Sequence, residues 1–90
     1  MANNFKFLSN RIRDSIRLKL YGDFDGSSAF ELINILKNYR NGSHKIFIDT
    51  NNLNTIHRFG KDVFKRNLRI LDININNITI TGKNRNYLES

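Results

Sequence analysis

The chain has 90 residues, which fits a single domain over residues 1–90 with a thin core, because a chain of this size buries only roughly 60–65% of the surface that its unfolded form exposes. It contains no cysteine, which excludes disulfides and thiolate metal sites. Its net charge of +7 indicates an anionic partner, which could be an acidic protein or a nucleic acid.

The first residues, Met1 to Phe7, contain no long apolar run of the kind that makes a secretory signal. No stretch of the sequence approaches the ~20 apolar residues that span a bilayer. Together with the absence of cysteine, these patterns predict a cytoplasmic protein that does not insert into a membrane.

Two strands are expected at the start of the chain. Residues 5–8 alternate weakly and predict an edge strand, and the polar residues 10–14 predict a turn. Residues 15–21 alternate with the period of a half-buried strand, so the two strands should form a hairpin. The alternation places Ile16, Leu18 and Leu20 on one face and Arg17, Lys19 and Tyr21 on the other.

A helix is expected after a loop over residues 22–26. Ser28 and Glu31 have the spacing of a capping box, in which each side chain accepts a hydrogen bond from an orphan backbone N–H. Apolar residues then recur every three or four positions to about Tyr39, and the pair Asn41-Gly42 tolerates the positive φ of a helix stop. The apolar positions are Ala29, Leu32, Ile33 and Leu36.

The second half of the chain predicts a strand, a helix and a last strand. Residues 44–49 are apolar without alternation, which is typical of a central strand buried on both faces. Residues 53–59 are expected to connect this strand to a helix over residues 60–70. A last strand should end at Thr81, and the chain from Gly82 onward is expected to be a polar tail in which Tyr87-Leu88 could pack. The apolar residues of the last strand are Ile73, Ile75, Ile78 and Ile80.

The order of these elements, β-β-α-β-α-β, predicts an α/β fold. Its sheet should be mixed, with about four strands and with helices packed mainly on one face. Strands separated by a helix should be parallel, with right-handed crossovers.

This order, together with short motifs at fixed points, resembles the STAS family, the fold of bacterial anti-sigma-factor antagonists. Residues 18–25 resemble the family's strand that ends in Gly, a hydrophobic residue and Asp, and residues 46–49 resemble its central strand that ends in Asp. The apolar positions of the first helix match the family's core face, and residues 53–63 resemble the approach to its second helix. The similarity covers roughly residues 15–81 and implies a regulatory module that binds another protein.

The sequence departs from the family at the regulatory site. Family members carry Asp, Ser or Thr, Ser and Gly at the start of the second helix, and a kinase phosphorylates one of the hydroxyls. Here His57, Arg58 and Phe59 precede Gly60, so no hydroxyl in this segment can accept phosphate. We therefore expect a contact that is constitutive or controlled in another way.

A second departure concerns the end of the chain. Family members usually carry a further helix or two after the last strand, whereas only Lys83 to Ser90 remains here. One face of the sheet is then expected to be less covered. A homodimer or a larger partner chain could cover that face.

Histidines and carboxylates are the residues that a catalytic or metal site would need. His44 is predicted to be a surface residue, and His57 has Asp62 nearby in sequence, but a single pair does not make a catalytic or metal site. Asp23, Asp25 and Asp49 are expected near the carboxyl ends of parallel strands, where ligands gather. Paired carboxylates there could bind a metal or act as acid and base, but capping by Asp25 and a turn at Asp49 are the favoured interpretation. We predict no catalytic site, no metal and no cofactor.

Basic residues on the second helix and its lead-in favour the binding of an anionic partner. There are five of them against the single acidic residue Asp62: Arg58, Lys61, Lys65, Arg66 and Arg69. Several recur every three or four positions and should share a face. The sequence has no zinc finger, no RRM-type aromatic strand motif and no Gly-x-x-Gly clamp, which favours a protein partner over nucleic acid.

We predict a non-enzymatic, regulatory module for protein–protein interaction, which binds an acidic protein such as an anti-sigma factor. The alternative is a basic nucleic-acid-binding domain that uses the same second helix. The predicted contact residues lie on that helix, on its lead-in and on the loop before the first helix: Asp23, Asp25, Ser27, Ile56, His57, Arg58, Phe59, Gly60, Lys61, Lys65 and Arg69.

Overall fold

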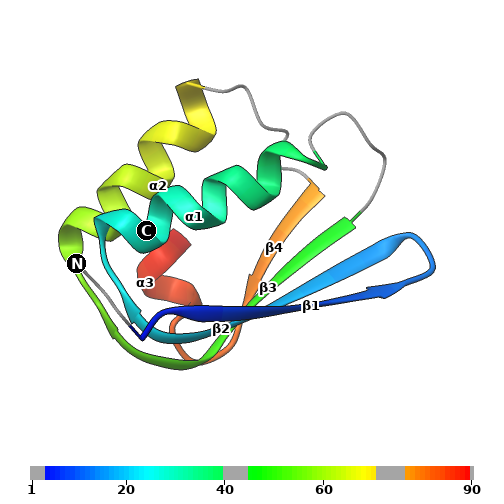
Figure 1. Cartoon of the computed structure of the whole chain (residues 1–90), viewed down its shortest axis with the longest axis horizontal. Helices are drawn as coiled ribbons and strands as arrows, with labels where there is room; N and C mark the ends of the chain where they lie inside the picture. Colours follow the sequence, from blue (N-terminus) through cyan, green and yellow to red (C-terminus); the bar gives the residue numbers. More distant parts are fainter. Residues whose placement is uncertain (1–3, 40–44, 71–76, 90) are drawn as a thin grey trace.

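The computed structural model of the chain describes residues 4–39, 45–70 and 77–89. Its elements are, in chain order, β1 (Lys6–Ile12), β2 (Ser15–Phe24), α1 (Gly26–Lys37), β3 (Lys45–Ile56), α2 (Arg58–Ile70), β4 (Ile78–Thr81) and α3 (Arg85–Glu89). The four strands form one sheet in the order β1-β2-β3-β4, in which β1 is antiparallel to β2 and the other neighbours are parallel. α1 and α2 lie together on one face of this sheet (Figure 1). This arrangement confirms the predicted α/β fold.

The core lies between the sheet and the two longer helices. The alternation predicted for β2 is observed, and the buried side chains of β2 and α1 include Ile16, Leu18, Leu20, Ala29, Leu32, Ile33 and Leu36. At the end of β2, the Phe24 ring packs edge-on against the rings of Phe5 and Phe64, with centroids 5.9 and 6.1 Å away. Phe24 therefore joins β2 to α2 and to the residue before β1.

β3 is longer than the sequence predicted. The strand does not end at Asp49 but continues to Ile56, so the predicted connection over residues 53–59 was wrong. Two register shifts against β2 accommodate the polar run, and the Asp49 carboxylate accepts a hydrogen bond from the Asn51 N–H (2.9 Å) at the first of them. Because backbone groups make the ladder, asparagine side chains that suggest a loop do not end the strand. Its burial also differs from the prediction, since Phe47 is only half-buried.

α1 begins earlier than predicted. The N-cap is Asp25, whose carboxylate accepts from the Ser28 N–H (2.9 Å), so the capping box of Ser28 and Glu31 was wrong. The Ser28 hydroxyl instead donates to the backbone carbonyl of Asp23 (2.9 Å). β2 extends to Phe24, which shortens the predicted loop before the helix.

The residues after β4 form a short helix rather than only a polar tail. Leu88 of α3 is buried in the core, as the expected packing of Tyr87-Leu88 allows. The turn before α3 is tied to β3 through the buried Thr50, whose hydroxyl donates to the Thr81 carbonyl (2.7 Å) and accepts from the Asn84 N–H (3.2 Å). The end of β4 and the start of α3 are therefore held by one side chain of the central strand.

Substitution Thr50→Val should lower the free energy of unfolding by about 1–3 kcal/mol, because valine keeps the shape but leaves two partly buried backbone groups, the Thr81 carbonyl and the Asn84 N–H, without this partner. Urea denaturation would measure the change. Thr79→Val is the matched control, since Thr79 is exposed on β4 and its replacement should change stability by about 0.5 kcal/mol or less. Equal losses in the two variants would contradict a role for the Thr50 hydrogen bonds.

Some predicted features lie outside the described residues: His44, the helix stop at Asn41-Gly42, Ile73 and Ile75. In the described part of the chain, β4 ends at Thr81 as predicted. No helix in these ranges combines the length and the apolar character that crossing a membrane requires.

Candidate partner-binding site

The two longer helices begin side by side because the strands before them end side by side. β2 ends at Phe24 and β3 at Ile56, and these two residues are partners in the parallel ladder. The His57 N–H then donates to the Phe24 carbonyl (2.8 Å), which holds the start of α2 against the end of β2. The structure thus brings together the loop before α1 and the lead-in to α2, as the predicted site requires.

Glycines allow the two helix starts to touch. A Cβ atom on Gly60 would lie 2.7 Å from the carbonyl oxygen of Asp25 and 2.8 Å from that of Phe24, so only glycine fits the first turn of α2 at this distance. A Cβ on Gly26 would lie 2.7 Å from the ring of Phe59, so this ring stands over the first residue of α1. Residues 25–27 and 57–60 therefore form one continuous surface.

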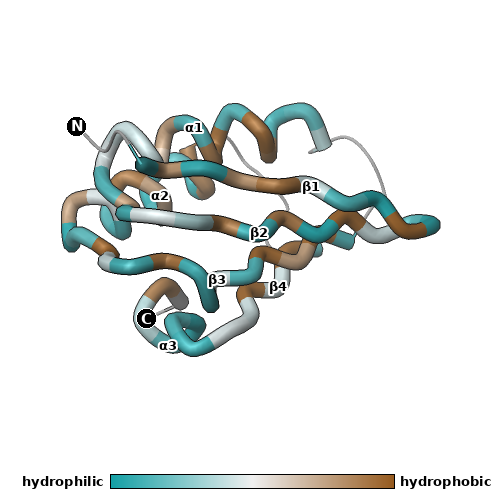
Figure 2. Tube along the Cα trace, turned by 60° about the horizontal axis from the view of Figure 1, so that its bottom comes forward, coloured by the Kyte–Doolittle hydropathy of each residue, from teal (hydrophilic) through white to brown (hydrophobic). Residues whose placement is uncertain are grey.

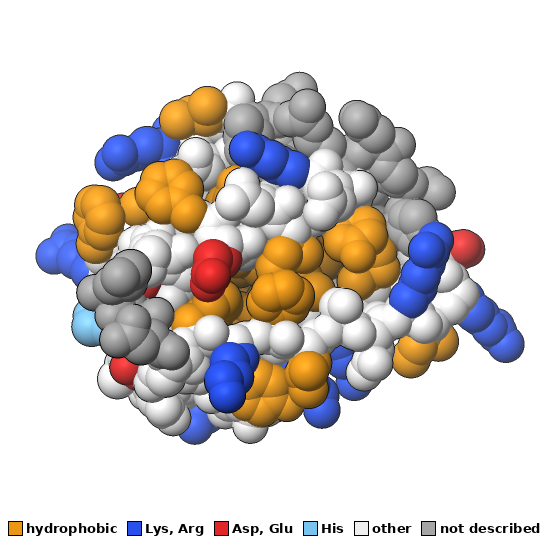
Figure 3. All heavy atoms as spheres, in the orientation of Figure 1, with side chains coloured by type: hydrophobic (Ala, Val, Ile, Leu, Met, Phe, Trp, Pro, Cys, Tyr) orange, Lys and Arg blue, Asp and Glu red, His pale blue; other side chains and the backbone are white. Residues whose placement is uncertain are grey.

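The centre of this surface is apolar. Phe59 is 66% exposed, and Phe30, one helical turn beyond Gly26 on α1, is 52% exposed. Figure 3 shows hydrophobic side chains over α1 and α2, and a larger hydrophobic group between α1 and β1. Phe30 is not among the contact residues predicted from the sequence, although its position outside the spacing of the buried α1 residues is a signal of exposure.

Basic side chains surround the start and the outer side of α2. Arg58 is exposed at the first residue of the helix, where the macrodipole is already positive. Arg66 and Arg69 are exposed further along, whereas Lys61 and Lys65 are half-buried, and the Lys61 ammonium lies 4.5 Å from the centroid of the Tyr87 ring of α3. Of the five basic residues predicted on this helix and its lead-in, Arg58, Arg66 and Arg69 are therefore the more exposed and the two lysines the less exposed.

The carboxylates near this surface have structural partners. Asp23 accepts from the Thr55 hydroxyl (2.7 Å) and thereby links β2 to β3. Asp25 caps α1 and also accepts from the Ser27 hydroxyl (2.9 Å), which supports the capping interpretation. Within the described ranges, no three His, Asp or Glu side chains cluster in a way that could hold a metal ion.

The predicted site residues fall into three groups. Ser27, His57, Arg58 and Phe59 are exposed on the shared surface of the two helix starts. Gly60 is buried, and Asp23, Asp25 and Ile56 are half-buried, so these four residues support the exposed ones and offer little surface of their own to a partner. The remaining predicted residues, Lys61, Lys65 and Arg69, lie along α2.

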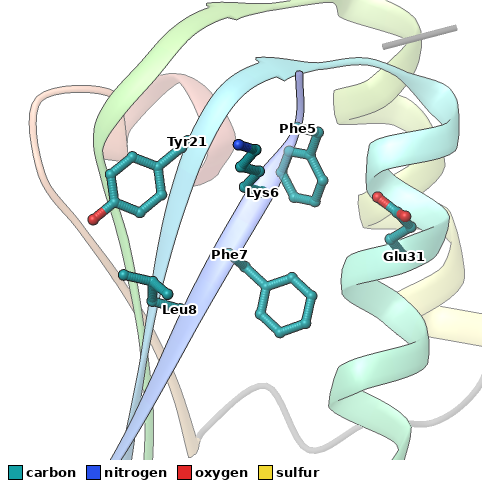
Figure 4. Close-up of a pocket in the computed structure, with 6 residues that line it drawn as sticks. All are labelled: Phe5, Lys6, Phe7, Leu8, Tyr21 and Glu31. Carbon is teal, nitrogen blue, oxygen red and sulfur yellow. The ribbon is translucent and has the colours of Figure 1, made fainter. Parts of the chain in front are cut away.

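One hollow lies away from this surface, at the β1 edge of the sheet. It measures about 510 Å³ and is lined by Phe5, Lys6, Phe7, Leu8, Tyr21 and Glu31 (Figure 4). Its lining is mostly apolar and includes no residue of the predicted site. We therefore place the candidate site at the helix starts, where exposed apolar and basic side chains combine.

Comparisons with known proteins address the fold. No protein-family model matches the sequence, and no curated protein matches it. Two solved structures of Mglu superpose on the chain with TM-scores of 0.64 and 0.67, at 17% and 14% sequence identity. They cover 84% and 83% of this chain, which spans only 19% and 22% of the Mglu chains.

A third solved structure is an uncharacterized protein of the DUF3478 family from Shewanella loihica PV-4, described as having a SpoIIAA-like fold. It covers 92% of this chain and 70% of its own length, at 13% identity and with a TM-score of 0.54. Identities this low show the fold alone. The chain therefore has a SpoIIAA-like fold, which is the STAS-type fold that the sequence resemblance predicted.

Proposed function

We propose that this chain is a STAS-type regulatory module that binds an acidic protein through the paired starts of α1 and α2. The observation that carries the proposal is the Phe59 ring, which is 66% exposed, stands over Gly26 and adjoins Arg58. An exposed aromatic side chain beside arginine is the composition typical of interface hot spots.

The proposed partner presents an apolar anchor ringed by carboxylates. The anchor packs on Phe59 and Phe30, and a carboxylate meets Arg58 at the positive end of the α2 dipole. Arg66 and Arg69 extend the positive potential along α2 and speed the encounter with an acidic surface. Because residues 57–59 carry no hydroxyl, phosphorylation of a serine, threonine or tyrosine within this segment does not control the contact.

Charge reversal at the centre of the surface tests the proposal. Arg58→Glu should weaken partner binding about tenfold or more, equivalent to about 1.4 kcal/mol, because it places a like charge against the partner's carboxylates. The matched control is Lys37→Glu, which makes the same change in net charge at the other end of α1. Circular dichroism should show both variants folded.

The partner for this measurement is identified by differential capture. The immobilised wild-type chain and the Lys37→Glu variant should both retain it from nuclease-treated lysate of the source cell, and Arg58→Glu should not. The affinity of the purified partner is then measured by calorimetry. An affinity that Arg58→Glu leaves unchanged would contradict the proposed surface.

The formation of a homodimer is a separate prediction from the binding of an acidic protein. If a second copy covers the open face of the sheet, size-exclusion chromatography with light scattering should give twice the mass of the chain. The mass of a single chain under the same conditions would exclude it.

A further inference from the structure

The face of the sheet opposite α1 and α2 carries basic and aromatic side chains. The register of the strands places Arg17 beside Phe47 and Lys19 beside Asp49 on this face, since their neighbours Ile16, Leu18 and Ile48 point into the core. Figure 4 shows Tyr21 and Leu8 pointing away from α1, to the same open side. In Figure 2 the strands lie in front of α1 and α2, and hydrophilic and hydrophobic positions are mixed along them.

A hollow of about 290 Å³ lies on this face beside the β1–β2 turn. It is lined by Asn10, Ile12, Arg13, Ser15, Arg17 and Phe47. Phe47 is half-buried on the central strand β3, so part of its ring is available to a ligand, and Lys45 is the ladder partner of Ser15 at the same end. The hollow thus combines one aromatic ring with arginines from two positions of the hairpin.

The turn beside the hollow holds a residue in an unfavourable backbone conformation. Arg13 has φ of 54°, and it is the non-glycine residue with positive φ in the described part of the chain. Glycine or asparagine would adopt this conformation at lower cost, so the chain keeps an arginine here at the expense of stability. Such a cost is typical of positions at which the side chain serves a function.

We propose that this hollow binds single-stranded nucleic acid, with one base stacked on Phe47 and the backbone phosphates bound by Arg13, Arg17 and Lys45. Aromatic platforms within a positive groove are the general means of binding single strands without sequence preference. Tyr21 and Lys19 continue the surface along β2 toward its other end. An acidic peptide without aromatic residues would use the arginines but would leave the Phe47 ring without a stacking partner.

Binding is measured by fluorescence anisotropy with short labelled oligothymidylate and oligouridylate. The wild-type chain should bind both, and the logarithm of the affinity should fall with the logarithm of salt concentration with a slope near −2. This slope follows from about −0.7 for each phosphate neutralised by the three basic residues Arg13, Arg17 and Lys45.

Arg13→Gly separates binding from stability. It should weaken oligonucleotide binding by roughly fivefold through loss of a charged contact, while the melting temperature rises by roughly 2–5 °C because the strained conformation suits glycine. Phe47→Leu keeps an apolar side chain but removes the stacking platform, and it should weaken binding by roughly fivefold or more. Lys37→Ala removes one charge on the helix side and should leave the affinity within about twofold.

Three results would overturn the proposal. One is the absence of wild-type binding to either oligonucleotide at low salt. Another is binding that Arg58→Glu abolishes while Arg13→Gly and Phe47→Leu leave it unchanged, since this would place nucleic acid on α2. The third is binding to vesicles of anionic phospholipid, sensitive to the same hollow variants, in the absence of oligonucleotide binding. The first and third results leave the protein partner proposed for the helix starts untouched, whereas the second would also make nucleic acid a ligand of that surface.

Discussion

Phe24→Ala should lower the free energy of unfolding by about 3–5 kcal/mol, which is the usual cost of removing a buried aromatic ring. The Phe24 side chain is fully buried and meets the rings of Phe5 and Phe64 edge-on, so truncation leaves a cavity lined from two other segments. A domain of this size has a total stability of only about 5–13 kcal/mol. The variant should therefore be largely unfolded at moderate denaturant concentrations where the wild type is folded.

Chemical denaturation followed by circular dichroism checks this expectation. Phe30→Ala is the matched control, because it makes the same change on the exposed side of α1, where the loss should be below about 1 kcal/mol. Similar losses in the two variants would show that Phe24 does not anchor the core.

Gly60→Ala should destabilise the protein by about 2 kcal/mol, although alanine is the better helix former. Helix propensity alone predicts a gain of about 1 kcal/mol. Against this, the added Cβ would meet the backbone carbonyls of Asp25 and Phe24 at 2.7 and 2.8 Å, and overpacking of this kind costs typically 1–3 kcal/mol. Backbone atoms at the N-cap of α1 cannot move aside without breaking the cap, so we place the cost of overpacking at the upper end.

Gly26→Ala is the control for Gly60→Ala, since both glycines lie in the first turn of a helix. The Cβ added at Gly26 would meet only the ring of the exposed Phe59, which can rotate away. Thermal melts should therefore show a clear loss for Gly60→Ala and a small change for Gly26→Ala. Because the ring moves, Gly26→Ala should nevertheless weaken partner binding. A gain in stability for Gly60→Ala would contradict the close approach of the two helix starts.

Much of the fold could be predicted from side-chain periodicity. The alternation of β2 and the spacing of apolar residues in α1 each identified the buried face, because burial of that face is what selects the residues. Periodicity failed at the second half of β3, where the ladder depends on backbone hydrogen bonds and tolerates exposed asparagines. It also failed at the start of α1, since both Asp25 and Ser28 are good N-cap residues and only the length of β2 decides between them.

The candidate site could be predicted only in part. The resemblance to STAS proteins located residues 57–60 at the start of α2, and the structure places the turn before α1 beside them. The spacing of charges could not show that Lys61 lies against Tyr87, because α3 was not foreseen. The close approach of Gly60 to the backbone of Phe24 and Asp25 could not be predicted either, because it depends on how α2 packs against the end of β2. Glycine at a helix start also has several ordinary explanations.

The order of strands in the sheet equals their order in the chain, which has a consequence for synthesis on the ribosome. Each strand that emerges finds its neighbour already formed at the growing edge, and no later strand must enter between two earlier ones. The first hairpin is local and needs no distant segment. Until β4 and α3 emerge, however, β3 presents an open edge and the Thr50 hydroxyl lacks its partners. The nascent domain should therefore become resistant to proteases only when its last segment has left the exit tunnel.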